Sequence, residues 1–292
     1  MIEKTEAIVL RSVKFQESSL ISTLFTRKFG RISVIARGAR KPKSRFSAML
    51  TPGQLLEVVF HHKETRAVQT LTEADYIDAR NRFRTDLQKL AVITTLSELL
   101  LQVLHENDPN EPLFDFLKTM TAWMDQKAEL SPALFPYLQI RIADKIGFGL
   151  QLEDVESELE GADSELEDVD GDLAEAEAEN EKERGGFREP HGQRNSHVQK
   201  ESPRRPAYYL NIASGSLSRE PDVQNPIRLT STQFQFVSRA VTSGDASIFS
   251  VPLTQAECSQ LIMYIDKYYD YHVEGIRPRK SDAIFKQLFG IS

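Results

Sequence analysis

Short apolar runs rich in β-branched residues fill the first 80 residues of the chain. The runs are EAIVLRSV, SLISTLFT, RISVIARG, QLLEVVFHH and RAVQTLTEA, and turn-forming residues separate them. Five strands of this length are enough for a small closed barrel such as the OB-fold. An SH3-like barrel fits the strand count nearly as well, so the periodicity alone does not choose between them.

After Tyr76 the spacing of apolar residues becomes helical. RFRTDLQKLAVITTLSELLLQVL, DPNEPLFDFLKTMTAWM and SPALFPYLQIRIADKIGF predict three helices, each with one apolar face. Nearer the C-terminus, AYYLNIASGSL predicts a short strand and turn, and LTSTQFQFVSRAVTSG, LTQAECSQLIMYIDKYYDYHV and KSDAIFKQLFG predict three more helices. Thr254 and Glu257 form a capping-box pattern at the start of the second of these. The chain is therefore predicted to be α+β, with a five-stranded barrel over residues 1–80 and an all-helical domain over residues 81–292.

A polar segment interrupts the second domain from about residue 153 to residue 206. Residues 151–183 hold 16 Asp or Glu residues and one Lys, a net charge of −15. The whole chain carries −7, so the other 259 residues carry +8. Because the segment has little apolar material to offset the entropy of ordering, it is predicted to be a disordered insert. It is either a solubilising loop or a DNA mimic that shields a basic surface of the same chain.

The barrel region contains a long stretch without acidic residues. The 39 residues between Glu17 and Glu57 hold no Asp or Glu but eight Lys or Arg, five of them in RGARKPKSRF. These five cations, next to Arg27, Lys28 and Arg31 at another turn, are expected to concentrate charge on one side of the barrel. Such a surface binds polyanions because neutralised phosphates release condensed counterions. Phe46, isolated among the cations, suits either base stacking or anchoring of the loop, whereas most of Phe15, Phe25, Phe29 and Phe60 are predicted to lie in the core. The predicted nucleic-acid contacts are Arg27, Lys28, Arg31, Arg37, Arg40, Lys41, Lys43, Arg45 and Phe46.

No pattern of a catalytic site occurs in the sequence. It lacks a phosphate loop, a dinucleotide fingerprint, a nucleophile elbow and a zinc-protease helix. His61 and His62 are adjacent on a predicted strand and point to opposite faces, so they are not expected to share a metal. Cys258, the single cysteine, is expected to be a small core residue. The protein is therefore predicted to be no enzyme, to need no cofactor or metal, and to be cytoplasmic, without a secretion leader or a membrane span.

Two separated segments carry a family resemblance: EAIVLRSVKFQESSLISTLFTRKFGRISVIARGARKPKSRF near the amino terminus and YIDKYYDYHVEGIRPRKSDAIFKQL near the carboxyl end. They are similar to the corresponding ends of RecO, a family of bacterial DNA repair and recombination mediators. The resemblance implies an OB-fold followed by a helical domain, and DNA contacts at Lys14, Arg31, Arg37, Arg40, Lys41 and Lys43. Many members hold a four-cysteine zinc site in segments that read GFGLQLEDVESELEG and ASGSLSRE here, without cysteine. Zinc is therefore excluded for this chain, and the insert enters where that site would lie.

The resemblance also implies a function without chemistry of its own. Such proteins bind single- and double-stranded DNA, anneal complementary strands, contact the single-stranded-DNA-binding protein SSB, and with RecR help to load RecA onto SSB-coated DNA. The alternative is an adaptor whose basic face binds acidic protein tails, with DNA binding incidental. A third class, a nuclease or other enzyme, would need a ligand cluster that the sequence does not offer. Salt dependence separates the first two. About five single-strand phosphate contacts predict a slope of about −3.5 for the logarithm of the binding constant against the logarithm of the salt concentration, whereas a site for one peptide should respond more weakly.

Overall fold

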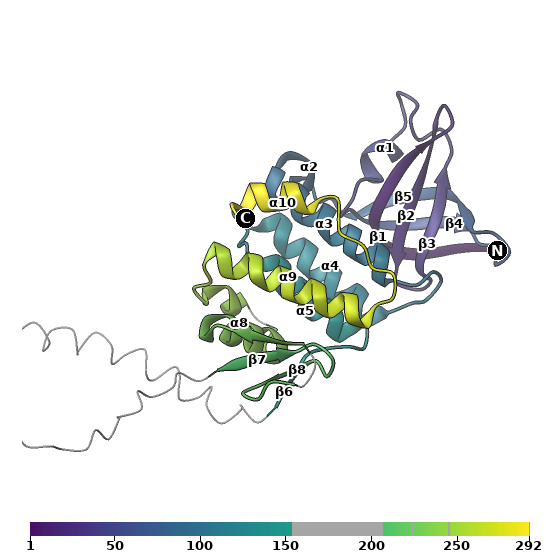
Figure 1. Cartoon of the computed structure of the whole chain (residues 1–292). Coiled ribbons are helices and arrows are strands. Elements are labelled where there is room, and N and C mark those ends of the chain that lie inside the picture. The colour runs from purple at the N-terminus through teal and green to yellow at the C-terminus, as the bar shows by residue number, and fades with distance from the viewer. Residues whose placement is uncertain (154–206, 223–224, 245, 292) are drawn as a thin grey trace, which may run out of the picture.

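The computed structural model describes residues 1–153, 207–222, 225–244 and 246–291 of the chain. Apart from Glu153, the predicted acidic insert lies outside these residues. A closed β-barrel built from the N-terminal part stands against a mainly helical body (Figure 1). The predicted order of a barrel followed by a helical region is therefore confirmed.

Five strands close the barrel in the order β1-β2-β3-β5-β4. All neighbouring pairs are antiparallel except β3 and β5, which run parallel. This five-stranded Greek-key arrangement is the OB-fold. It settles the choice between an OB-fold and an SH3-like barrel, which the periodicity left open. The strands are β1 (Ile2–Phe15), β2 (Ser19–Thr26), β3 (Gly30–Ala36), β4 (Leu55–His61) and β5 (Val68–Asp78).

The continuous apolar run in β1 serves two cores. Successive side chains of a strand point to opposite faces. Ala7 and Val9 face the interior of the barrel, whereas Ile8 and Leu10 join the core of the helical body. Phe25 of β2 also reaches the body, where its ring lies 5.8 Å from that of Phe114. One side of the barrel is thus buried against helices.

The helical body follows the predicted elements closely. The capping box at Thr254 and Glu257 is confirmed, and Thr230 forms a second one with Gln233. The helices are α2 (Arg82–Thr85), α3 (Leu87–Val103), α4 (Glu111–Gln126), α5 (Leu134–Lys145), α8 (Ser231–Thr242), α9 (Gln255–His272) and α10 (Asp282–Phe289), with a 3-10 turn η1 (Ala246–Ser250).

A small sheet makes the expectation of an all-helical body incomplete. Its strands, in the order β6-β8-β7-β9, are β6 (Gln151–Leu152), β8 (Ser216–Ser218), β7 (Tyr208–Asn211) and β9 (Pro226–Leu229). β6 and β8 lie in the two segments without the expected cysteines, and they pair with each other. The buried Asn211 amide donates to the hydroxyls of Ser216 and Ser218, at 3.1 Å each. These bonds brace the sheet with polar side chains.

Arg80 joins the barrel to the body. Its side chain is 1% exposed, and it donates to the carbonyls of Gly53 and Lys118 and to the hydroxyl of Thr121. Burial lowers the pKa of the guanidinium. Gln54 donates to the Arg80 carbonyl at 2.8 Å and accepts from its backbone N–H. We call this contact zone between barrel and body the seam.

Candidate nucleic-acid interface

Two loops lie side by side at one end of the barrel (Figure 1). They are the β1–β2 turn, residues 16–18, and residues 37–45, which lead from β3 into α1 (Phe46–Met49). Arg40 ties them together, because its backbone N–H donates to the Ser18 carbonyl at 2.9 Å and its guanidinium donates to the Gln16 carbonyl at 3.2 Å. We call these two loops, with the last residues of β1, the loop end.

Residues 37–45 are held by their own hydrogen bonds and by the core. Gly38 has φ +69, a left-handed conformation that favours glycine, and its carbonyl accepts from the Lys41 N–H at 3.1 Å. Ala39 is fully buried in the barrel core, and Phe46 is partly buried against the same core. Of the two roles considered for Phe46, its packing matches anchoring of the loop.

The loop end presents cations without counter-charges. Five of the predicted contacts are exposed there and have no ion-pair partner in the part of the chain that the structure describes: Lys14, Arg37, Arg40, Lys41 and Lys43. Arg45 lies 3.3 Å from the Asp75 carboxylate. Glu17 is the single acidic residue within the two loops. The loop end is therefore a cationic surface with one carboxylate at its tip.

The remaining three predicted contacts lie at the opposite end of β2. Arg27 and Lys28 lie in the β2–β3 turn, and Arg31 is the second residue of β3. The eight residues of β2, about 26 Å, separate them from the loop end. Arg27 pairs with Glu111 at 3.2 Å and Asp115 at 3.0 Å, both on α4. The expectation that all eight cations share one side of the barrel is therefore wrong.

Arg31 is also engaged by the body. Its guanidinium donates to the Leu101 carbonyl at 3.1 Å and lies 3.7 Å from Glu106. Neighbouring Gly30, at φ +62, allows this approach, because a Cβ there would overlap the Asp108 carbonyl. Lys28 is exposed and lines a separate hollow together with Arg66. Of the three cations, only Lys28 is open to solvent without a described partner.

The prediction that most of the barrel phenylalanines lie in the core is confirmed, with Phe15 as the exception. Phe25 and Phe60 are fully buried and Phe29 packs against the barrel core, but Phe15 is 38% exposed. Phe15 ends β1 and lines a hollow with Ile35, Arg37 and Lys41. Simple alternation from the interior residues Ala7 and Val9 would place Phe15 inside, but the register shift between Val9 and Arg11 turns the later odd-numbered residues of β1 to the outer face.

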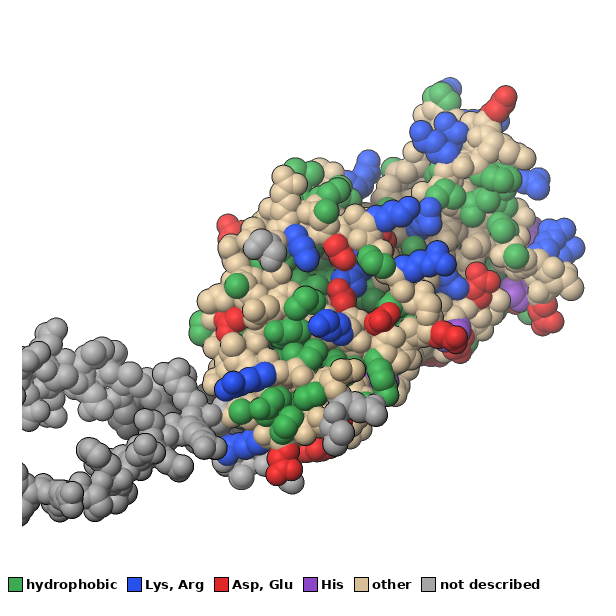
Figure 2. Space-filling model, viewed as in Figure 1, with side chains coloured by type: hydrophobic (Ala, Val, Ile, Leu, Met, Phe, Trp, Pro, Cys, Tyr) green, Lys and Arg blue, Asp and Glu red, His purple; other side chains and the backbone are tan. Residues whose placement is uncertain are grey.

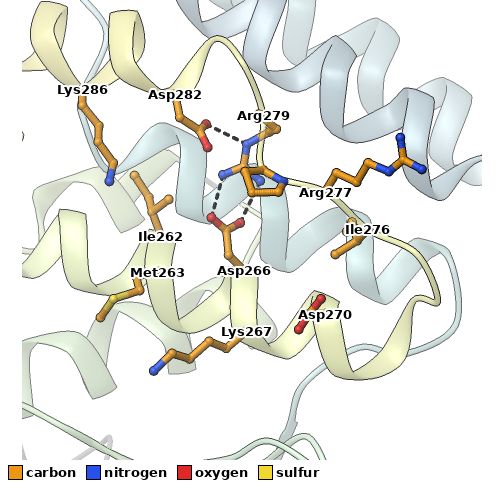
Figure 3. A pocket seen from close by; sticks show the side chains of 11 residues that line it. Ile262, Met263, Asp266, Lys267, Asp270, Ile276, Arg277, Arg279, Asp282 and Lys286 are labelled. Carbon is orange, nitrogen blue, oxygen red and sulfur yellow. Dashed lines mark hydrogen bonds and ion pairs between the residues drawn. The ribbon is translucent and has the colours of Figure 1, made fainter.

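A hollow on the helical body has a different character. It lies between α9 and the segment leading into α10 (Figure 3). Arg279 is 9% exposed there and donates to both carboxylate oxygens of Asp266 at 2.7 Å and to Asp282 at 2.8 Å. Its positive charge is therefore neutralised within the fold, and this hollow presents mixed charge rather than a cationic surface.

Potential metal-binding groups do not gather in the described ranges. No group of three or more His, Cys, Asp or Glu residues that could hold a metal occurs among the residues that the structure describes. Cys258 is fully buried, and burial raises its pKa to about 11, so the prediction of a core thiol is confirmed. Within the same residues, no helix has the length and apolar character needed to cross a membrane.

The fold and the loop end define an OB-fold protein with an exposed cationic surface, attached to a helical body. Two family models match the chain: "Recombination protein O N terminal" over residues 1–80 and "Recombination protein O C terminal" over residues 84–166. Together they cover more than half of the sequence. The chain belongs to the recombination protein O (RecO) family.

Curated relatives with the name DNA repair protein RecO agree with this assignment. The chain is 36% identical over 146 residues to the protein of Salinibacter ruber. The matched stretch covers 50% of this chain and 56% of that relative. It is 31% identical over 153 residues to the protein of Chlorobium limicola. This second matched stretch covers 52% of this chain and 59% of that relative. The match thus spans less than two thirds of the relatives' own length.

Proposed function

We propose that this protein is a mediator of DNA repair and homologous recombination that binds single- and double-stranded DNA at its loop end. In this proposal it anneals complementary strands and, with RecR, helps to load RecA onto SSB-coated DNA. Residues 1–80 are the DNA-binding domain and residues 81–292 the supporting body. The protein acts in the cytoplasm, without catalysis and without a cofactor.

The observation that carries the proposal is the group of five unpaired cations at the loop end, Lys14, Arg37, Arg40, Lys41 and Lys43. A cation without a protein carboxylate is free to replace the counterions condensed on phosphates, and the released ions favour binding whatever the base sequence. Arg40 holds the two loops together through backbone carbonyls. The charges are therefore presented from a fixed platform, which lowers the entropy lost on binding.

Annealing follows from the same surface. Two complementary strands repel each other through their phosphates, and a sequence-independent cationic surface lowers that repulsion while it raises the local concentration of both strands. No base-specific hydrogen bond is needed, since the strands select each other by pairing. Arg27 and Arg31 are left out of this surface because the helical body already engages their charges.

The test is a titration of a labelled single strand with the full chain, alone, with the complementary strand, and with SSB bound. The proposal expects binding, faster formation of duplex, and retained binding on the SSB-coated strand. Charge reversal by Arg37→Glu with Lys41→Glu is expected to abolish most of this activity. A matched control, Arg228→Glu with Lys267→Glu, makes the same change in net charge at exposed positions of the body.

Two results would contradict the proposal. If the control variant lost as much binding as the loop-end variant, the effect would be one of net charge and not of this surface. If the protein bound an acidic peptide but no oligonucleotide, the cations would serve an adaptor that docks acidic protein tails. An acidic peptide that merely competes weakly with DNA is expected, because both ligands are anionic.

A further inference from the structure

The outer face of β1, β2 and β3 carries an apolar row. Val13 pairs across the strands with Ile21, and Ile21 pairs with Ile35, so the three side chains lie next to one another. Phe15 lies two residues beyond Val13 and therefore on the same face of β1. Val13 is 39% exposed, Phe15 is 38% exposed, and the two isoleucines are half-buried. We call these four residues the outer platform.

The outer platform has no cover among the described residues. Farther along β1 and β2, Ile8, Leu10 and Phe25 also point out of the barrel, but they join the core of the helical body. Figure 2 shows hydrophobic side chains gathered on the open face of the barrel, with Lys and Arg side chains around them. Single exposed apolar residues are ordinary on a protein surface, but a contiguous group on one face is typical of a binding surface.

The rim of the outer platform is cationic. Arg11 precedes Val13 on the same face of β1 and is exposed. Arg37 and Lys41 line the hollow that also contains Phe15 and Ile35, and no carboxylate lines that hollow. An apolar floor beside cations fits a ligand that carries flat apolar rings on an anionic chain. Unpaired nucleotides have this character, whereas a duplex hides the faces of its bases in the stack.

We propose that the outer platform binds the unpaired bases of single-stranded DNA, with Phe15 stacking on a base while Arg37 and Lys41 neutralise neighbouring phosphates. This inference rests on the proposed DNA-binding function and adds direct contact with bases. It predicts that the barrel distinguishes single strands from duplexes, which a purely electrostatic surface does only weakly. The same cations disfavour a second copy of this chain as the occupant, because the two rims would repel.

The test compares three ligands by fluorescence anisotropy with the full chain: a thymidine strand, an abasic strand with the same number of phosphates, and a duplex of equal length. The unmodified protein is expected to bind the thymidine strand about tenfold more tightly than the abasic strand, within the range of one base stacked on an aromatic ring. Phe15→Ala is expected to remove that difference and leave the abasic and duplex affinities unchanged. Phe15→Trp is expected to retain it.

Tyr76→Ala is the matched control, since Tyr76 is also 38% exposed but lies on β5 beyond the outer platform. It should leave all three affinities and the melting temperature unchanged, and Phe15→Ala should leave the melting temperature unchanged.

If Phe15→Ala kept the preference for the thymidine strand while Arg37→Glu with Lys41→Glu weakened binding of all three ligands, the inference would fail and the proposed function would stand. Failure of the unmodified protein to bind any ligand would overturn the function itself. A change in sedimentation mass of Phe15→Ala without any change in DNA binding would show a protein interface instead.

Discussion

The two ends of β2 carry the same kind of side chain into different surroundings. At the β2–β3 end, Arg27 and Arg31 meet carboxylates and a carbonyl of the helical body. At the loop end, Arg37 and Lys41 are exposed, with no ion-pair partner among the residues that the structure describes. All four belong to one acid-free stretch of sequence. Arginines at the seam hold the barrel in place, whereas cations at the loop end remain available to a ligand.

The difference shows that a stretch without acids is not yet a cationic surface. Glu111 and Asp115 lie more than 80 residues from Arg27 in the chain, yet they compensate its charge in the fold. A compensated arginine must break its ion pair before it can neutralise a phosphate, so it contributes less to binding. The comparison leads to predictions that separate stability from DNA affinity, beginning with the largest expected effect.

Removal of the Arg80 side chain should cause the largest loss of stability. Arg80→Ala leaves buried carbonyls at Gly53 and Lys118 without this donor, which costs about 3 kcal/mol. The melting temperature in a thermal unfolding scan should fall by roughly 6–12 °C. The exposed Arg84→Ala is the control and should change it little. An Arg80→Ala protein as stable as the original would show that the seam does not depend on this arginine.

Charge reversal at the loop end should lower DNA affinity and leave stability nearly unchanged. Arg37→Glu with Lys41→Glu is expected to lower oligonucleotide affinity roughly 30-fold or more at low salt, because two phosphate contacts become repulsions. The free energy of unfolding should stay within about 0.5 kcal/mol of the original value, since neither side chain has a described ion pair. Anisotropy and chemical denaturation measure the two quantities. A loss of stability without a loss of affinity would show that these two residues stabilise the fold, as the seam arginines do, and do not bind DNA.

Truncation of a seam arginine should barely affect binding. Arg27→Ala removes two half-exposed ion pairs and is expected to cost about 0.2–1 kcal/mol of stability. Its DNA affinity should change less than twofold, against the large loss expected from Arg37→Glu with Lys41→Glu. A loss of affinity as large as that of Arg37→Ala, measured side by side, would erase the distinction between the two ends of β2.

The smallest effect is expected from the acidic tip of the loop end. Glu17→Gln removes the single carboxylate of the two loops without a large change in shape. Single-strand affinity should rise about twofold at low salt, and the gain should disappear at high salt because the repulsion is screened. A decrease in affinity would indicate that Glu17 positions a cation rather than opposing the phosphates.

The strands of the barrel were predictable because each carries a short apolar run bounded by turn residues. The short strand predicted in AYYLNIASGSL is confirmed as β7, but the sheet around it was not predictable, since β6 has two residues and β8 has three, too few for any alternation to appear. Their pairing also joins segments more than 60 residues apart in sequence. In the body, by contrast, the capping box at Thr254 is a local signal, and it correctly marked the start of α9.

The candidate site was predictable only in part. The cations of residues 37–45 could be found from composition, because a loop between strands is exposed by default. The engagement of Arg27 and Arg31 depends on how the barrel packs on the body, which no local pattern encodes. Most barrel phenylalanines were expected in the core because they alternate with other apolar residues, whereas the register shift in β1 leaves Phe15 exposed on the outer face. Burial at a strand end is decided by the neighbouring elements and not by the strand itself.

The central claim is that five unpaired cations at the loop end bind the phosphates of DNA. Its most direct test is the dependence of single-strand affinity on salt concentration, measured for the full chain and for Arg37→Glu with Lys41→Glu. With five contacts the slope of log K against log salt should be about −3.5, and with the two positions reversed it should shrink to about −2 or less in magnitude. An identical slope for the two proteins would contradict the account.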